Sequence, residues 1–313
     1  MSKLDPKKIM RGVWRRINQR AQDMIFPDYA MIRRIPQHLD MISLGSTPAR
    51  FAIDYAGTDV KGFNLAVCPQ TLEYDMRMLK NMHSFLDDNG PRVAALVLCP
   101  FSLLKDRYRH EDGPLSRDLR YYLILHHAMI NGYDEAVYQR LRHKAPLLLA
   151  SRANLRTALR RPLMRKLAAT ANGLGADGMR ESARSYIAGW SREFGLGDLA
   201  AGNMSADASR ALGDNAALIG DMVRFCAERD IRLVAVVPPL SQALRDMIPD
   251  SFIEKNLYAP LRGTGVPVFD FAAEPGLADD DNCFVDALCL NAAGRRTFTR
   301  RLTDGLKQHG ILR

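Results

Sequence analysis

The sequence lacks the features of a membrane-spanning or disulfide-stapled protein. No apolar run approaches the roughly 20 residues that a spanning helix needs. The N-terminal region has no compact apolar core of a secretory signal, so we expect a cytoplasmic protein. The five cysteines are odd in number and include no CxxC pair: Cys68, Cys99, Cys226, Cys283 and Cys289. This pattern favours reduced thiols over disulfides or a zinc site, and we expect no metal and no cofactor.

Positive charge is in excess and unevenly placed. The net charge of +9 is concentrated in two clusters, 3–34 and 152–166. Such clusters suit an anionic partner, for example lipid headgroups or acidic polysaccharide, but solvated helix faces explain them almost as well. The clusters lack aromatic interleaving and no nucleic-acid-binding module is recognisable, so we expect no specific nucleic-acid partner. The oligomeric state is left open.

The first basic cluster coincides with an amphipathic pattern. Apolar residues recur at three- and four-residue spacing from Ile9 to Ile25, beside Trp14, which predicts a helix over 6–25. Such a helix can pack on its own domain, or it can lie on an anionic membrane surface and hold the protein at the periphery of the inner membrane. We therefore separate a basic N-terminal segment, 1–37, from a single α/β domain, 38–313.

Five short apolar runs alternate with helical patterns along that domain. Of the 313 residues in the chain, 47% are hydrophobic and 25% are charged, which is enough to form a sizeable core. The alternation predicts a three-layer α/β/α sandwich with a mainly parallel sheet of about five strands. The predicted strands are 41–44, 61–67, 92–99, 231–237 and 266–271. Three helices are predicted outside the insertion. The first begins at Pro69 and ends at Asn89-Gly90, and the other two span 206–229 and 291–307.

Between the third and fourth strands the alternation stops. Residues 105–203 hold helical patterns at 117–129, 135–150 and 152–171 and glycine-rich stretches at 172–178 and 195–202. This stretch is too long for a plain loop, so we interpret it as a helical insertion. It emerges just after the third strand, and a lid over the strand ends is one hypothesis for it.

The first strand ends at Gly45-Ser46, and Pro48 prevents its regular continuation. Ser46 is therefore expected on a tight turn at the carboxyl end of a buried strand, where open α/β sheets place their chemistry. A glycine before the serine permits a sharp turn that exposes the hydroxyl. The alternative is that Ser46 only caps a helix.

Three blocks of the sequence resemble the SGNH/GDSL hydrolase superfamily, and more closely its divergent bacterial branches associated with acylation of envelope and capsular polysaccharides. Leu44-Gly45-Ser46 matches the nucleophile block, Asn64-Leu65-Ala66 the start of the second block, and Phe284 to Gly294 the last. The resemblance covers roughly 38–105 and 206–308. It implies that Ser46 is the nucleophile and Asp286 the aspartate of the triad, with Gly45, Asn64, Ser102 and Asn291 in oxyanion or substrate-binding positions.

Two positions depart from that pattern. The triad histidine is replaced by Cys289, a thiol that cannot accept and return a proton as imidazole does. Pro69 stands near the second-block glycine and has no N–H to donate to an oxyanion.

These departures leave two hypotheses. The first is a degenerate SGNH-like site that binds a glycan or acylated intermediate of polysaccharide metabolism. The alternative is an active acyl esterase or acyltransferase that uses Ser46 with a non-standard base, such as His83, His126 or His127, or that uses Cys289 itself as nucleophile.

Overall fold

The computed structural model describes residues 6–106, 117–150, 155 and 174–313. The chain divides into two compact units. One holds 1–35 and 109–167, and the other holds 36–108 and 168–313. The N-terminal 35 residues and the first part of the predicted insertion thus group in one unit, and the rest of the insertion groups with the sheet.

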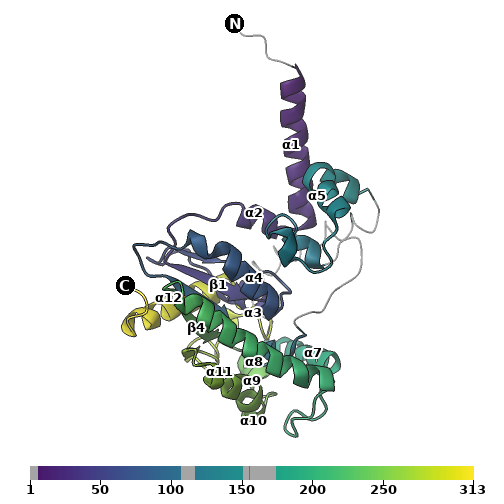
Figure 1. Ribbon diagram of the computed structural model, residues 1–313. Helices are drawn as coiled ribbons and strands as arrows, with labels where there is room; N and C mark the ends of the chain where they lie inside the picture. Colours follow the sequence, from purple (N-terminus) through teal and green to yellow (C-terminus); the bar gives the residue numbers. More distant parts are fainter. Residues whose placement is uncertain (1–5, 107–116, 151–154, 156–173) are drawn as a thin grey trace. The chain divides into compact units, whose positions relative to one another are not determined.

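The larger unit is built on a five-stranded sheet in the order β2-β1-β3-β4-β5 with every pair parallel (Figure 1). The strands are β1 Met41–Gly45, β2 Gly62–Asn64, β3 Val93–Val97, β4 Arg232–Val237 and β5 Val268–Asp270. All five predicted strands are present, and the predicted α/β class with a parallel sheet is confirmed. The strand order reverses between β1 and β3, so the carboxyl ends of these two strands form the switch point where such sheets bind ligands.

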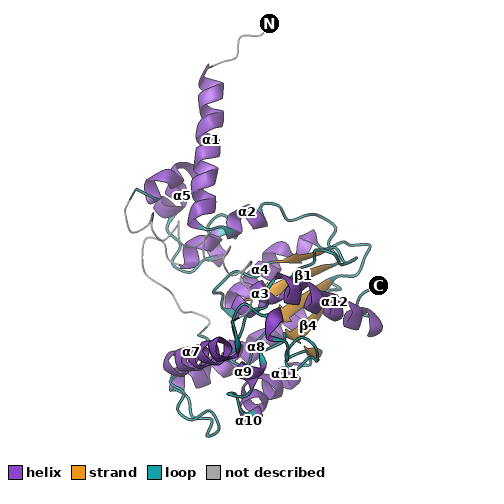
Figure 2. Ribbon diagram, turned by 180° about the vertical axis from the view of Figure 1, so that it is seen from behind, coloured by secondary structure: helices purple, strands orange, loops and turns teal. Residues whose placement is uncertain are grey.

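Helices cover both faces of this sheet. Those of the larger unit are α3 Thr47–Ala52, α4 Leu72–Met82, α7 Ala176–Phe194, α8 Ala206–Ala227, α9 Gln242–Arg245, α10 Asp250–Ile253, α11 Ala259–Thr264 and α12 Ala292–Gln308. α4 packs on β1 and α8 on β4, and Figure 1 shows both in front of the sheet. Residues of α3 and α12 instead share a buried cluster with β1, β3 and β4, and Figure 2 shows α12 from that other side.

The pleat explains why two layers of helices are needed. In β1 and β3 every residue is buried, so side chains that point to opposite faces both need an apolar cover. On the α12 face, Val93, Ala95 and Val97 of β3 meet Phe298 and Leu302. This two-sided burial produces the continuous apolar runs from which the strands are predicted.

Two helix boundaries differ from the sequence prediction. The helix expected from Pro69 to Asn89 begins only at Leu72 and ends at Met82. Its expected first turn is extended because the Gln70 N–H is hydrogen-bonded to Ser46 Oγ, 2.9 Å away. At the other end, Leu86 forms a parallel bridge with Leu39, which draws the chain into an extended path.

The smaller unit pairs α1 Pro6–Ile25 with α5 Glu135–Leu148, with α2 Asp28–Ile32 following α1. The predicted helix 6–25 is confirmed. The predicted helix 135–150 ends at Leu148 and is kinked at Lys144, whose backbone angles are not helical. The expected helix at 117–129 is wrong, because 117–121 and 127–129 are two separate 3₁₀ turns. The Leu119 carbonyl accepts from the Tyr29 hydroxyl and from Tyr122 N–H rather than joining an α-helical ladder. The expected helix 152–171 lies outside the described residues, except for residue 155.

The turn at Gly45 yields a stability prediction. Its φ is +129°, and a Cβ there would lie 2.5 Å from the Val97 carbonyl oxygen and 2.8 Å from the Ala49 Cβ. We expect Gly45→Ala to lower the free energy of unfolding by about 2 kcal/mol or more, measured by urea denaturation. Gly213→Ala is the matched control, since Gly213 lies in α8 with open space around it, and it should stabilise by about 0.5–1 kcal/mol. Equal effects of the two changes would contradict this interpretation of the turn.

Candidate functional site

The Ser46 hydroxyl lies at the switch point but does not cap a helix. Ser46 follows β1 and precedes α3, yet its side chain makes no capping hydrogen bond. Its Oγ instead accepts a hydrogen bond from Gln70 N–H, from the loop after β2. Ser46 thus occupies the N-cap position of α3, as the alternative interpretation has it, but its hydroxyl does not cap the helix.

A buried carboxyl group is hydrogen-bonded to the turn at Gly45-Ser46. Asp75 of α4 is 2% exposed, and its Oδ1 accepts from Gly45 N–H at 2.6 Å and from the Gln70 side-chain amide. Burial raises the pKa of Asp75 to about 7, although these hydrogen bonds oppose the rise. Sequence reasoning missed Asp75; the available signal is an acidic residue on the apolar face formed by Leu72, Met76 and Leu79.

Three of the residues predicted to bind an oxyanion or substrate are hydrogen-bonded to the backbone of the protein. The Asn64 amide nitrogen donates to the Ala49 and Ile53 carbonyls at 3.0 and 3.1 Å, which fixes α3 against β2. Ser102 Oγ accepts from Cys99 N–H at 2.9 Å. Asn291 caps α12 by accepting from the N–H groups of its first turn at 3.0 Å. The described structure thus gives each of these side chains a local structural bond.

The predicted triad positions Asp286 and Cys289 come together with a residue that sequence reasoning missed. Asp286 Oδ1 accepts from the N–H groups of Leu288 and Cys289 at 3.0 and 2.8 Å. Its Oδ2 accepts from the hydroxyl of Tyr186 at 3.1 Å, and that hydroxyl lies 3.9 Å from Cys289 Sγ. Tyr186 is 100 residues away in sequence, on the unpredicted helix α7, so no local motif reveals this contact.

Burial keeps the thiol of Cys289 and the hydroxyl of Tyr186 protonated. Cys289 is 4% exposed, and burial, with the neighbouring Asp286 carboxylate second, raises the pKa of its thiol well above the usual value. The pKa of Tyr186 is raised by burial and then by the same two neighbours. Near neutral pH, Cys289 is therefore a thiol and Tyr186 a hydrogen-bond donor.

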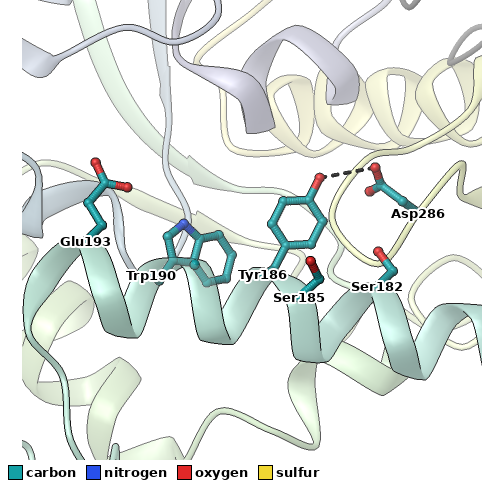
Figure 3. Close-up of a pocket in the computed structure, with 7 residues that line it drawn as sticks. Ser182, Ser185, Tyr186, Trp190, Glu193 and Asp286 are labelled. Carbon is teal, nitrogen blue, oxygen red and sulfur yellow. Dashed lines mark hydrogen bonds between the residues drawn. The ribbon is translucent and has the colours of Figure 1, made fainter.

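A pocket of about 500 Å³ opens beside this group, and Figure 3 shows its side chains along one face of α7 with Asp286 opposite. Its lining residues are Ser182, Ser185, Tyr186, Gly189, Trp190, Glu193 and Asp286. The Trp190 ring stacks on Phe101 with centroids 4.1 Å apart, and Tyr186 lies 5.4 Å from Trp190. Ser182 Oγ accepts from Ala287 N–H at 3.2 Å and so ties α7 to the Asp286 loop.

The loop after β2 interacts with the Ser46 hydroxyl and also affects the thiol of Cys289. Gln70 contacts the Ser46 hydroxyl, and Cys68, two residues earlier, contributes electrostatically to the raised pKa of Cys289. Pro69 lies between them and has no N–H.

No imidazole completes a triad among the residues that the structure describes. Within 6–106, 117–150 and 174–313, no histidine is hydrogen-bonded to Ser46, Asp286 or Cys289. The ring of His83 contacts the Lys80 carbonyl and Phe225 instead. In this part of the chain, no group of three or more His, Cys, Asp or Glu side chains is arranged to hold a metal ion.

No protein-family model matches the sequence, and no curated protein matches it either. The resemblance to the SGNH superfamily therefore rests on the residues at 44–46, 64–66 and 284–294.

The buried Asp75 predicts a specific pH dependence of stability. Its pKa of about 7 in the fold lies above its unfolded value of about 3.9. The folded chain therefore binds a proton that the unfolded chain releases in this window, so this group's stabilisation is complete below about pH 4 and is lost as the pH rises to about 7. Asp75→Asn should remove a slope of up to about 1.4 kcal/mol per pH unit across the window, measured by urea denaturation at several pH values.

The control is Asp304→Asn, which changes an exposed carboxylate on α12 and should keep the parent slope. An Asp75→Asn variant with the parent slope would show that Asp75 does not titrate in this range.

Proposed function

We propose that this chain is an SGNH-like protein of envelope or capsular polysaccharide metabolism that binds a glycan or acylated intermediate without hydrolysing it. The observation that carries the proposal is the hydrogen bond from Tyr186 to Asp286 beside the thiol of Cys289. In the superfamily that the sequence resembles, this aspartate orients a histidine, and here it accepts from a tyrosine.

The chemistry of these groups does not activate Ser46. A buried, protonated thiol cannot act as general base, and a tyrosine whose pKa is raised keeps its proton and donates only a hydrogen bond, so it does not act as a base either. Asp286 Oδ1 is already bonded to two backbone N–H groups and Oδ2 to Tyr186. An unassisted serine hydroxyl is a poor nucleophile near neutral pH.

The pocket on α7 supports sugar binding. The rings of Tyr186 and Trp190 offer apolar surface for the C–H faces of a sugar ring, and the stack of Trp190 on Phe101 holds that surface in place. Ser182 and Ser185 hydroxyls and the Asp286 carboxylate add polar partners for sugar hydroxyl groups. A rigid aromatic wall with few polar groups loses little entropy on binding.

Calorimetric titration with a panel of capsular oligosaccharides, each in acetylated and deacetylated form, tests the proposal. We expect binding of at least one oligosaccharide, with its acyl group intact after incubation. Trp190→Ala should weaken that binding by about tenfold or more, because removal of a buried aromatic anchor commonly has this effect. Trp14→Phe, in the other unit, is the matched control and should bind as the parent does. Equal affinity of Trp190→Ala and the parent, or release of the acyl group, would contradict the proposal.

Tyr186→Phe separates the ring from its hydroxyl. The variant keeps the ring and removes the hydrogen bond to Asp286. We expect the affinity to change less than in Trp190→Ala, because the aromatic surface is kept and only one hydrogen bond is lost. A larger loss in Tyr186→Phe than in Trp190→Ala would contradict the role given to the aromatic wall.

A further inference from the structure

The helix α1 is buried on its own unit through its carboxyl-terminal half, and Trp14 adds one hydrogen bond to α5. Asn18 and Gln22 are buried, and their amide nitrogens donate to the carbonyls of Arg142 and Leu141 of α5 at 2.7 and 2.9 Å. Ala21 and Ile25 are buried on the same part of the helix. The part of α1 before Asn18 has no comparable burial among the described residues.

That earlier part exposes a continuous apolar surface, which we call the α1 apolar face. It consists of Ile9, Met10, Val13, Trp14 and Ile17, which are 49, 72, 51, 47 and 45% exposed. At 100° per residue, these five positions span an arc of about 140° on one side of the helix. Scattered single apolar residues are normal on a surface, but a contiguous group of this kind marks an interaction site.

Positive charge surrounds this face. The sequence from 6 to 22 holds six cations, Lys7, Lys8, Arg11, Arg15, Arg16 and Arg20, and no carboxylate. Arg11, Arg15, Arg16 and Arg20 are exposed. The Trp14 indole N–H donates to the His143 carbonyl at 3.1 Å, while its ring stays nearly half exposed.

We propose that α1 binds the surface of a bilayer that contains anionic phospholipids. The helix lies in the interface, with the α1 apolar face among the acyl chains and the arginines at the phosphate groups. Trp14 is suited to this depth, because its ring is apolar and its N–H is polar. No helix of the described chain is long and apolar enough to cross a membrane, so the contact is with the surface.

The positive charge of α1 favours lipid over the other possible partners of the α1 apolar face, a second copy of the chain or a nucleic acid. A second copy of α1 would bring two sets of six cations together, against a single carboxylate on each helix, Asp23, which already pairs with Arg33. A nucleic acid would neutralise the cations but would leave the apolar face in water. An anionic bilayer surface accommodates both features at once.

Vesicle co-sedimentation of the full chain tests the proposal, with phosphatidylcholine vesicles and vesicles in which about 30% is phosphatidylglycerol. We expect the parent to partition at least about tenfold more strongly onto the anionic vesicles, since each cation near such a surface contributes about fivefold. In 0.5 M salt this preference should shrink, because the Debye length falls below about 5 Å. Trp14 fluorescence should shift to the blue on binding, and the shift should be absent in Trp14→Phe.

Two double variants separate the contributions. Val13→Asp with Ile17→Asp changes the α1 apolar face, and Arg11→Glu with Arg15→Glu changes the charge; each should weaken binding by about tenfold or more. Arg296→Glu with Arg300→Glu is the matched control, because it reverses the same number of exposed charges at the same spacing on α12. It should bind within about twofold of the parent. Circular dichroism shows whether each variant is folded.

The proposal is overturned if the parent does not bind anionic vesicles, if it binds neutral vesicles equally, or if the Val13→Asp/Ile17→Asp variant binds as the parent does. Self-association of the parent in sedimentation velocity, lost in that variant, would assign the face to a second copy. Equal competition by a generic DNA duplex would assign the cations to nucleic acid.

Discussion

The carboxylate of Asp286 joins the two segments that form the pocket. One oxygen closes its own loop through the N–H groups of Leu288 and Cys289, and the other accepts from Tyr186 of α7. The bond from Ala287 N–H to Ser182 Oγ joins the same two segments. The same interaction occupies the group that would orient a catalytic base, so the proposed loss of hydrolysis and the architecture of the pocket would have a common origin.

Much of the sheet could be predicted because its strands are buried on both faces. That burial leaves apolar runs such as 93–97, which stand out without any knowledge of partners. The end of β1 at Gly45-Ser46 was equally readable, since glycine and proline mark the turn. The boundaries of the helix 72–82 were harder to predict. The backbone at Gln70 and Leu86 is extended because it bonds to distant segments, and the periodic sequence pattern does not show these bonds.

The decisive residues of the site could not be read from local pattern. Tyr186 meets Asp286 across 100 residues of chain, on a helix that no predicted segment covers, between the glycine-rich stretches 172–178 and 195–202. Asp75 could have been suspected, because a carboxyl group on an apolar helix face needs a partner. The resemblance places Asn64, Ser102 and Asn291 in oxyanion or substrate-binding positions, but the structure uses their side chains to satisfy backbone groups. Polar residues at such positions serve the backbone as often as they serve a substrate.

The reactivity of Ser46 tests the central claim most directly. The purified chain would be incubated with a fluorophosphonate that labels activated serines, beside Ser46→Ala and an active serine esterase, and its intact mass would be measured. We predict that the esterase is labelled completely, while the parent and Ser46→Ala both keep their unmodified mass. A stoichiometric mass increase in the parent that disappears in Ser46→Ala would contradict the claim, because it would require a base that the described residues do not place at Ser46.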